Sequence, residues 1–221
     1  MPDPSMEGIG AVLLAAGRSS RMAKGLHKLL IEFDGMPLVR RSAMILAQVQ
    51  PAASVVVVGH RHAEIEAALS GLPMPVVVND RYLSGMGTSL ALGVSHPEMA
   101  GMDGVLIVLA DMPALHPSHV RSLVEVFNNA KRQVIVRASS GELPGHPVII
   151  PKPLIDQLKL LDGDTGAQHI IRSSPLPVQM SNIGAAALTD VDTLEDALLA
   201  GGNIQTGTMS LSKTLPFPGR R

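Results

Sequence analysis

The stretch that decides the fold is IGAVLLAAGRSSRM, residues 9–22. It opens with an apolar run, Ile9 to Ala15, that is long enough for one buried strand. The run then passes into a loop of small residues that contains Gly17, Ser19 and Arg21. Small residues leave backbone N–H groups accessible to an anion, because few Cβ atoms stand in the way. The stretch therefore predicts a strand that ends in an anion-binding loop.

Similar short runs recur along the chain and alternate with longer segments of helical period. The predicted strands are residues 9–15, 54–58, 75–79, 104–109, 133–138 and 146–150, and the predicted helices are 37–49, 62–70, 87–95, 117–130, 153–161, 165–172 and 193–200. This alternation is typical of a mostly parallel sheet with crossover helices. The first four runs are almost continuously apolar, which predicts strands covered on both faces. We expect one α/β domain over residues 7–200, followed by a flexible tail over 201–221 that is rich in Gly, Ser, Thr and Pro.

The composition excludes several classes of protein. The chain has 221 residues, no Cys, four aromatic residues, and 18 basic against 19 acidic side chains. Thiolate metal sites and disulfides are therefore ruled out. The missing basic excess argues against a nucleic-acid polymer as partner, and so few aromatics leave no stacking platform. No window is long and apolar enough for a membrane span, and no secretory signal is evident, so we expect a cytoplasmic protein.

Two cations stand in or near the loop. Arg21 and Lys28 add positive charge from two sides, Arg as a planar fork and Lys as a mobile point charge. That combination is the chemistry of a polyphosphate site. The spacing fits neither the P-loop nor the dinucleotide fingerprint, and the alternative interpretation is a small-residue turn with two solvated bases.

The residues from Leu14 to Met22, followed by Lys28-Leu29-Leu30, resemble the motif of the MobA-like nucleotidyltransferases. That group includes sugar-nucleotide pyrophosphorylases and molybdenum cofactor nucleotidyltransferases. The resemblance implies a Rossmann-like three-layer fold and transfer of a nucleoside monophosphate from an NTP with release of pyrophosphate. By matching position, it assigns Leu14, Ala15, Ala16, Gly17 and Ser19 to nucleotide binding, and Arg21 and Lys28 to the triphosphate.

A second stretch, from Asn79 to Leu90, resembles the base- and ribose-contacting segment of the molybdenum cofactor cytidylyltransferases. The resemblance assigns Asn79, Gly85, Thr88 and Ser89 to this contact. Gly85 allows close backbone approach, and the two hydroxyls at a helix start can bind a ligand. The alternative is that Thr88 or Ser89 is an N-cap.

Asp111 follows an apolar strand, where ligands bind in open α/β sheets. It resembles the family's Mg²⁺ ligand, and carboxylate oxygen suits that ion. Asp190 and Asp192 point the same way if the backbone is extended, and we favour Asp190 as a second metal ligand. The alternative is that Asp192 or Thr193 caps the last helix. His146 is the candidate contact for the pterin substrate.

The chain departs from the family pattern at three positions. Ala23 replaces a Gly, His27 stands where Pro commonly precedes the Lys, and Gln168 replaces an Arg that often follows Gly-Ala. The resemblance also bears on the base, because the guanylyl-transferring branch usually reads Leu-Ala-Gly-Gly where this chain has Ala16. A methyl group there obstructs a purine, which favours CTP over GTP.

The predicted reaction is attack by the terminal phosphate of molybdenum-bearing molybdopterin on the α-phosphorus of CTP, with Mg²⁺ as cofactor. Arg21, Lys28 and Asp111 are the predicted catalytic residues. The alternatives are a GTP-using or sugar-phosphate nucleotidyltransferase of the same fold, and a non-catalytic nucleotide-binding chaperone for cofactor insertion. A molybdenum enzyme that receives the product is a further expected partner, speculated from composition.

Overall fold

The structure is a computed structural model that describes residues 4–23, 25–164 and 166–203. Its centre is a seven-stranded sheet in the order β5-β4-β1-β6-β8-β7-β9. The strands are β1 (Ile9–Ala15), β4 (Ala53–Val58), β5 (Val76–Val78), β6 (Gly104–Leu109), β7 (Ile135–Ser140), β8 (Leu143–Pro151) and β9 (Val178–Asn182). Parallel pairs join β1 to β4 and β6, β4 to β5, and β7 to β9. The predicted mostly parallel sheet is confirmed.

Two strands of this sheet differ from the prediction. β8 runs antiparallel to both β6 and β7, a direction that the apolar run did not reveal. β9 was missed altogether. It lies at the edge of the sheet and four of its five residues are exposed, so no buried run marks it in the sequence.

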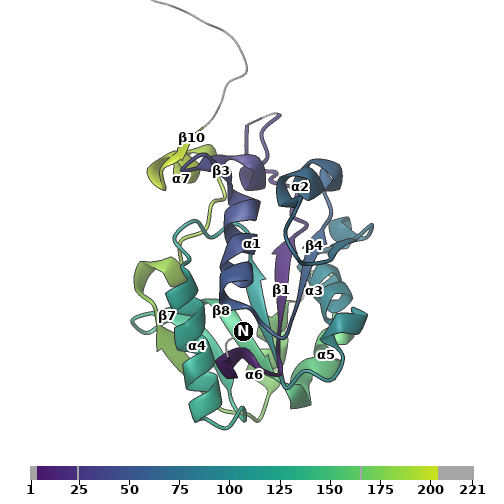
Figure 1. Cartoon of the computed structure of the whole chain (residues 1–221), viewed down its shortest axis with the longest axis vertical. Coiled ribbons are helices and arrows are strands. Elements are labelled where there is room, and N and C mark those ends of the chain that lie inside the picture. Colours follow the sequence, from purple (N-terminus) through teal and green to yellow (C-terminus); the bar gives the residue numbers. More distant parts are fainter. Residues whose placement is uncertain (1–3, 24, 165, 204–221) are drawn as a thin grey trace, which may run out of the picture.

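Helices cover both faces of the sheet. They are α1 (Leu38–Val49), α2 (His62–Leu69), α3 (Met86–Val94), α4 (Pro117–Asn129), α5 (Ile155–Lys159), α6 (Ala167–Ser173) and α7 (Leu194–Leu199). Short 3₁₀ helices are η1 (Pro4–Met6), η2 (Lys28–Leu30), η3 (Tyr82–Ser84), η4 (Pro97–Met99), η5 (Lys152–Leu154) and η6 (Gly184–Ala187). In Figure 1, α1 and α4 lie on one face of the sheet, and α3 and α5 on the other.

The core is divided between the two faces because neighbouring strand residues point in opposite directions. Leu13 of β1 belongs to one hydrophobic cluster with residues of α1 and α4, and Val12 belongs to another with residues of α3 and α5. Both side chains are completely buried. This explains the continuous apolar run of β1 and confirms the predicted three-layer fold.

Helix α1 fixes one end of the sheet. Its residues Leu38, Ile45, Leu46 and Val49 are buried along one face, and the hydroxyl of Ser42 donates to the carbonyl of Ala110 at 3.0 Å. The helix begins one residue later than predicted, because the backbone of Pro37 is extended and stands at the N-cap position. The bond from Ser42 holds the chain just after β6, which is the segment that carries Asp111.

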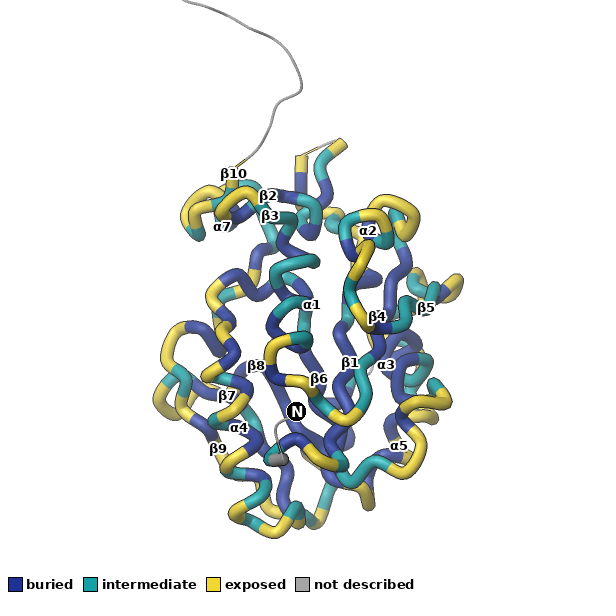
Figure 2. The backbone as a smooth tube through the Cα atoms, viewed as in Figure 1, coloured by how far each residue is buried: buried dark blue, intermediate teal, exposed yellow. Residues whose placement is uncertain are grey.

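A small three-stranded sheet lies next to α7, in the order β10-β2-β3 (Figure 2). Its strands are β2 (Glu32–Phe33), β3 (Met36–Pro37) and β10 (Gly202–Asn203). Gly202 and Asn203 pair with Phe33 and Glu32, so the folded part extends past the predicted boundary at residue 200. The prediction of a flexible tail is therefore wrong for residues 202 and 203, and residues 204–221 lie outside the described part.

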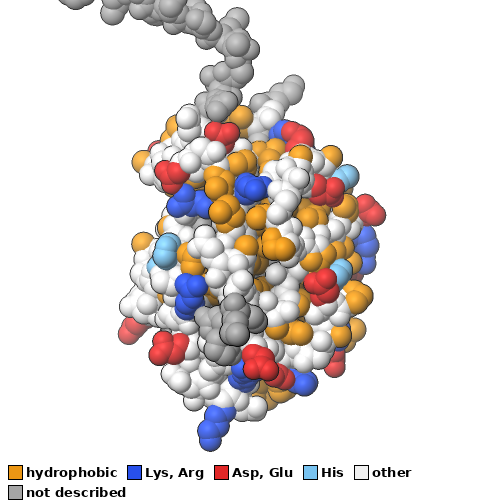
Figure 3. All heavy atoms as spheres, in the orientation of Figure 1, with side chains coloured by type: hydrophobic (Ala, Val, Ile, Leu, Met, Phe, Trp, Pro, Cys, Tyr) orange, Lys and Arg blue, Asp and Glu red, His pale blue; other side chains and the backbone are white. Residues whose placement is uncertain are grey.

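Within the described residues, no helix has the length and apolar character needed to cross a membrane. The face drawn in Figure 3 carries basic and acidic side chains interspersed. This mixed pattern agrees with the near-neutral net charge of the sequence.

Candidate active site

A cavity, here called the first cavity, opens at the carboxyl ends of β1 and β6. This is where ligands bind in open α/β sheets. Seven of the predicted site residues line it: Leu14, Ala15, Ala16, Gly17, Lys28, Ser89 and Asp111. Four residues that were not predicted also line it: Leu29, Tyr82, Met86 and Leu109. The structure therefore brings together the loop after β1 and the loop after β6.

The ammonium group of Lys28 lies between two carboxylates. Nζ donates to Asp111 Oδ2 at 2.5 Å and to Asp192 Oδ1 at 2.9 Å. Burial by itself lowers the pKa of this ammonium, but the charges and hydrogen bonds of Asp111 and Asp192 outweigh burial, so the pKa of Lys28 is raised. Lys28 is therefore a fixed cation on the wall of the first cavity.

The loop between β1 and η2 is held by its own hydrogen bonds. Ser19 adopts a positive φ of 54°, and its Oγ accepts from the backbone N–H of Lys28 at 3.2 Å. Ser19 thereby supports the turn that carries Lys28, and it does not line the first cavity. A Cβ added at Gly17 would meet no atom within 4 Å. The fold itself therefore does not require glycine at this position, and the approach to its backbone is open.

His27 connects the two sides of this loop. Its ring is buried, its Nδ1 accepts from the N–H of Leu29 at 3.4 Å, and its Nε2 lies 3.2 Å from the carbonyl oxygen of Gly17. Burial and the charges of His60 and Arg61 lower the pKa of His27 to about 4. The ring is therefore neutral near pH 7, and Nε2 carries the proton that it donates to Gly17. The sequence marked His27 as a departure from the family pattern and did not reveal this role.

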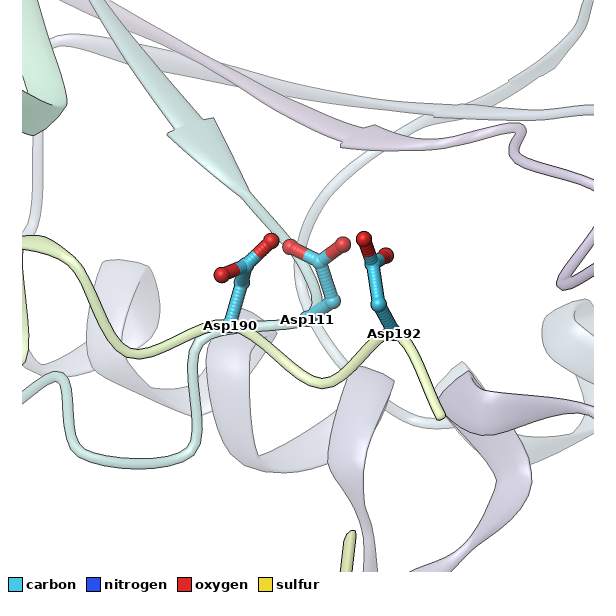
Figure 4. Close-up of side chains that lie close together, drawn as sticks. All are labelled: Asp111, Asp190 and Asp192. Carbon is cyan, nitrogen blue, oxygen red and sulfur yellow. The ribbon is translucent and has the colours of Figure 1, made fainter. Parts of the chain in front are cut away.

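Three carboxylates converge beside Lys28. Asp111 follows β6, and Asp190 and Asp192 come from the segment before α7 (Figure 4). One oxygen from each lies within 4.8 Å of the others. The backbone N–H of Val191 donates to the carbonyl of Asp111 at 2.9 Å, which fixes the two segments side by side. Asp190 and Asp192 point to the same side, as alternation along an extended segment predicts.

This donor set fits a divalent cation. Oδ1 of Asp111 is buried and has no hydrogen-bond partner, so it is open to a ligand. Burial and the charges of Asp111 and Asp192 raise the pKa of Asp190, which reports repulsion within the cluster. A bound cation relieves that repulsion, and carboxylate oxygens are the donors that hard cations prefer.

Asp192 has more contacts in this cluster than Asp190. Besides Lys28, it pairs with Nη1 of Arg21. The alternative that Asp192 or Thr193 caps the last helix is confirmed for Thr193, which is the N-cap of α7, and not for Asp192. Arg21 itself is 69% exposed and does not line the first cavity, so the structure places it at the rim.

Asn79, Thr88 and Ser89 form one buried group. The side-chain amide of Asn79 donates to both hydroxyls at 2.9 Å. Thr88 in turn donates to the carbonyl of Gly85 at 2.8 Å. The N-cap of α3 is Gly85, so the alternative that Thr88 or Ser89 caps this helix is wrong. Ser89 lines the first cavity, and Asn79 and Thr88 lie behind it.

Gly85 makes its close approach to the chain itself. A Cβ there would lie 2.3 Å from the carbonyl carbon of Gly163, and its φ is 120°. The N–H of Gly87 also donates to the carbonyl of Gly163 at 2.9 Å. Glycine at position 85 is therefore required for packing between the start of α3 and the loop before α6.

His146 lines a different cavity, here called the second cavity, together with Arg137 and Gln168. Leu14, Met86 and Leu109 line both cavities, so the two are adjacent. Burial and the charge of Arg137 lower the pKa of His146 to about 4. His146 thus lies in a cavity that adjoins the first one, near enough to Asp111 for the charge of that carboxylate to act on the pKa of His146.

Three residues near the site escaped prediction from sequence. Tyr82 is the one tyrosine of the chain and lines the first cavity. Arg137 lies within a predicted strand, where nothing distinguished it from a solvated surface residue. For His27, the departure from the family pattern was the available signal.

Residues 11–179, well over half of the chain, match the MobA-like NTP transferase domain. Bifunctional protein GlmU of Novosphingobium aromaticivorans is 33% identical over 58% of this chain, and the match spans 28% of that longer protein. Nicotine blue oxidoreductase of Paenarthrobacter nicotinovorans is 31% identical over 88% of this chain and 97% of its own length.

The crystal structure of Rv0371c from Mycobacterium tuberculosis H37Rv superimposes with a TM-score of 0.74, 25% identity, and coverage of 87% of this chain and 96% of that one. A complex of Rv0371c with manganese has the same fold, with a TM-score of 0.72, 23% identity, and coverage of 87% and 97%. The matched domain includes both the loop after β1 and Asp111. By sequence and by fold, the chain belongs to the MobA-like NTP transferase family.

Proposed function

We propose that this protein transfers CMP from CTP to the terminal phosphate of molybdopterin that carries molybdenum. The products are molybdopterin cytosine dinucleotide and pyrophosphate. The observation that carries the proposal is Lys28, held between Asp111 and Asp192 beside the open backbone of Gly17. A triphosphate site requires three features, and all are found here. They are a cation, carboxylates that bind a metal ion, and a loop of small residues whose backbone N–H groups are accessible.

Lys28 neutralises charge that builds on the leaving pyrophosphate. Arg21 is exposed and pairs with Asp192, and we propose that it adds a second positive charge to the triphosphate from the rim. The bond that forms joins a phosphate oxygen of the acceptor to the α-phosphorus, and the bond that breaks releases pyrophosphate. The attacking oxygen is already an anion, so no general base is needed. Alignment and charge stabilisation then account for the rate.

Asp111, Asp190 and Asp192 are the residues that would hold a divalent ion, and we propose Mg²⁺. When bound, such an ion offsets phosphate charge and polarises the reacting phosphoryl group. The manganese complex of Rv0371c makes Mn²⁺ the natural second ion to test.

The choice of CTP over GTP rests on Ala16. This residue lines the first cavity and is 8% exposed, and its carbonyl accepts from the N–H of His60 at 3.3 Å. That bond ties the backbone of residue 16 to the segment after β4, and the Ala16 methyl group leaves less room for a purine than a glycine would. Asn79, Thr88 and Ser89 form the proposed polar support of the base and ribose side.

A sugar phosphate is the second candidate acceptor, favoured by the identity to bifunctional protein GlmU. Nicotine blue oxidoreductase represents a different class of reaction. Because this chain matches nearly the whole length of that protein, oxidoreductase activity must also be assayed. A recipient molybdenum enzyme and a cytoplasmic location remain predictions from the sequence.

The deciding experiment measures pyrophosphate release by the full chain with each of the four NTPs. Each is tested with molybdenum-bearing molybdopterin, with a sugar 1-phosphate, and without acceptor, in Mg²⁺ or Mn²⁺. We expect release with CTP and the pterin. A preference for GTP, or release with the sugar phosphate alone, contradicts the proposal. Oxidoreductase turnover of nicotine blue, without pyrophosphate release, replaces it by an oxidoreductase function.

A further inference from the structure

Strand β9 forms one edge of the seven-stranded sheet. Proteins commonly protect such an edge with a very short strand, with proline or with charged side chains. The other edge strand of this sheet, β5, has three residues, and the edge strands β3 and β10 of the small sheet have two each, with Pro37 in β3. β9 has five residues, and none of them is charged or proline. Among the edges of the described residues, β9 is therefore the one without such protection.

The backbone groups of β9 that face away from the sheet follow from its pairing with β7. The C=O of Pro177 accepts from the N–H of Ile135 at 2.9 Å, and the N–H of Ile183 donates to the C=O of Ser139 at 3.0 Å. Residues alternate along a parallel strand, so the odd-numbered residues of β9 face β7 in the same way. The residues whose N–H and C=O groups face outward are therefore Val178, Met180 and Asn182.

On its inner side, β9 is fixed to the rest of the chain. The Oγ of Ser181 lies 2.8 Å from the Oγ of Ser122 in α4. The Oδ1 of Asn182 accepts from the N–H groups of Gly141 at 3.3 Å and Gly184 at 3.1 Å. The outer edge is therefore a preformed row of donors and acceptors, and a strand that pairs there does not have to order β9 first.

The side chains along this edge also favour a partner. Val178 and Met180 are 40% and 44% exposed, and they point to the same face of the sheet because side chains alternate along a strand. Arg137, which lies beside Met180, is the only charged residue of β7 and β9. An uncharged strand with two exposed apolar side chains meets no like charge when it pairs with a copy of itself.

We propose that β9 pairs antiparallel with β9 of a second copy of this chain, about a two-fold axis that passes between the two Met180 residues. In this register Met180 lies opposite its own copy, and Val178 lies opposite Asn182 of the second copy. Each outward-facing residue then meets another outward-facing residue, so both backbone hydrogen bonds form at every such pair. The edge is thus its own complement, which is the reason for choosing a second copy as the partner.

The two sheets join into one continuous sheet in this dimer. The two Arg137 side chains start from strands that are three strand spacings apart, about 14 Å. That separation exceeds the screening length of about 8 Å at physiological ionic strength, so their repulsion is weak. No residue of β9 lines the first or the second cavity, so the inference is independent of the proposed function.

The first test measures the mass of the full chain in solution by sedimentation equilibrium. We expect wild type to be a dimer. Met180→Lys sets two cations against each other, and Met180→Pro removes an outward N–H without touching the ladder to β7, so both are expected to be monomers with an unchanged circular dichroism spectrum. Leu199→Lys is the matched control, because Leu199 is an 81% exposed apolar residue of α7, and it is expected to remain a dimer.

The second test checks the register by disulfide formation, since the chain has no Cys. In the proposed pair the two Cα atoms of residue 180 are about 5.5 Å apart, within the range of about 4.4–6.8 Å that a disulfide spans. With oxidised glutathione, Met180→Cys is therefore expected to form a covalent dimer. Val178→Cys is the control, because its thiol lies four residues along the strand from that of its copy, about 14 Å, and is expected not to cross-link.

Three results overturn the inference. One is a wild-type chain that stays monomeric at its highest soluble concentration. Another is a wild-type dimer that persists in both Met180→Lys and Met180→Pro, because another surface then pairs the chains. The third is equal cross-linking, or equal absence of cross-linking, in Met180→Cys and Val178→Cys.

Discussion

The two cavities share a wall but hold their cations differently. In the first cavity, Lys28 is paired with both Asp111 and Asp192, and its pKa is raised. In the second, Arg137 has an unpartnered Nε and a lowered pKa. A cation with built-in counter-charges has its partners before any ligand arrives, whereas Arg137 is only partly buried and its buried Nε lacks a hydrogen-bond partner. The comparison shows that the two neighbouring cavities differ in whether the chain itself supplies counter-charges to their cations.

The largest effect is expected when one of the charged residues of the first cavity is replaced. Lys28→Met and Asp111→Asn are each expected to lower kcat about a hundredfold or more, because a group that stabilises transferring phosphate is lost. Pyrophosphate release measures the effect, and circular dichroism checks the fold. Lys152→Met is the matched control, since Lys152 also pairs with a carboxylate but is 64% exposed. Near-normal turnover by Lys28→Met contradicts the mechanism.

Gly17→Ala separates ligand binding from folding in the first cavity. Its new Cβ meets nothing within 4 Å and φ is not positive there, so the melting temperature is expected to stay unchanged. The KM for CTP is expected to rise about tenfold or more if a phosphate approaches this backbone. Gly85→Ala is the contrasting variant and is expected to destabilise the chain, because its Cβ overlaps Gly163. If Gly17→Ala and wild type have the same KM for CTP, the loop after β1 does not bind the nucleotide.

His27→Ala tests how far the first cavity depends on its internal supports. The variant loses the contact with Gly17 and the bond from Leu29, and it leaves a void. We expect a loss of about 2–4 kcal/mol in the free energy of unfolding. We also expect the KM for CTP to rise more than the KM of the acceptor, which a uniform loss of folded protein does not produce. His27→Gln retains an amide donor and is expected to recover part of the difference.

Asp190→Asn has the smallest expected effect. Burial and the charges of Asp111 and Asp192 raise the pKa of Asp190 in the folded chain. The free energy of unfolding therefore falls as pH rises from the pKa of Asp190 in the unfolded chain through its pKa in the folded chain. Above that window, and without a divalent ion, the variant is expected to melt about 1–2 °C higher than wild type. Added Mg²⁺ should reverse the order, because wild type has one more carboxylate ligand. Thermal melts at neutral pH, with and without Mg²⁺, decide this, and an identical response in both proteins removes Asp190 from the metal site.

The bounds of the strands were predicted correctly from the sequence where a local run of apolar residues determines the strand. β1 and β6 have the predicted bounds, because their residues are buried on both faces and few other arrangements explain such runs. β9 and β10 escaped because they are exposed or very short and are defined by pairing with distant strands. The sequence therefore predicted the bounds of the central strands and not those of the strands at the edges of the sheets.

The candidate site divides in the same way. Gly17 and Asp111 were predicted because they follow strand ends, and Lys28 because it is a cation near the loop at a position that matches the family motif. The sequence did not decide whether Asp192 caps the last helix or reaches the carboxylate cluster. A shift of the helix start by one residue would exchange these two roles. The isolation of Arg137 was invisible, because the sequence does not state which carboxylates lie near a given cation.

The sequence by itself determined the family, the mostly parallel sheet and the residue types at the ends of β1 and β6. Tertiary structure decided which charges meet. It placed Lys28 between carboxylates that are 83 and 164 residues away, and it placed Arg137 where no described carboxylate pairs with it. The physical reason is that burial depends on local periodicity, whereas an ion pair depends on distances of a few ångströms between segments that only the folded chain brings together.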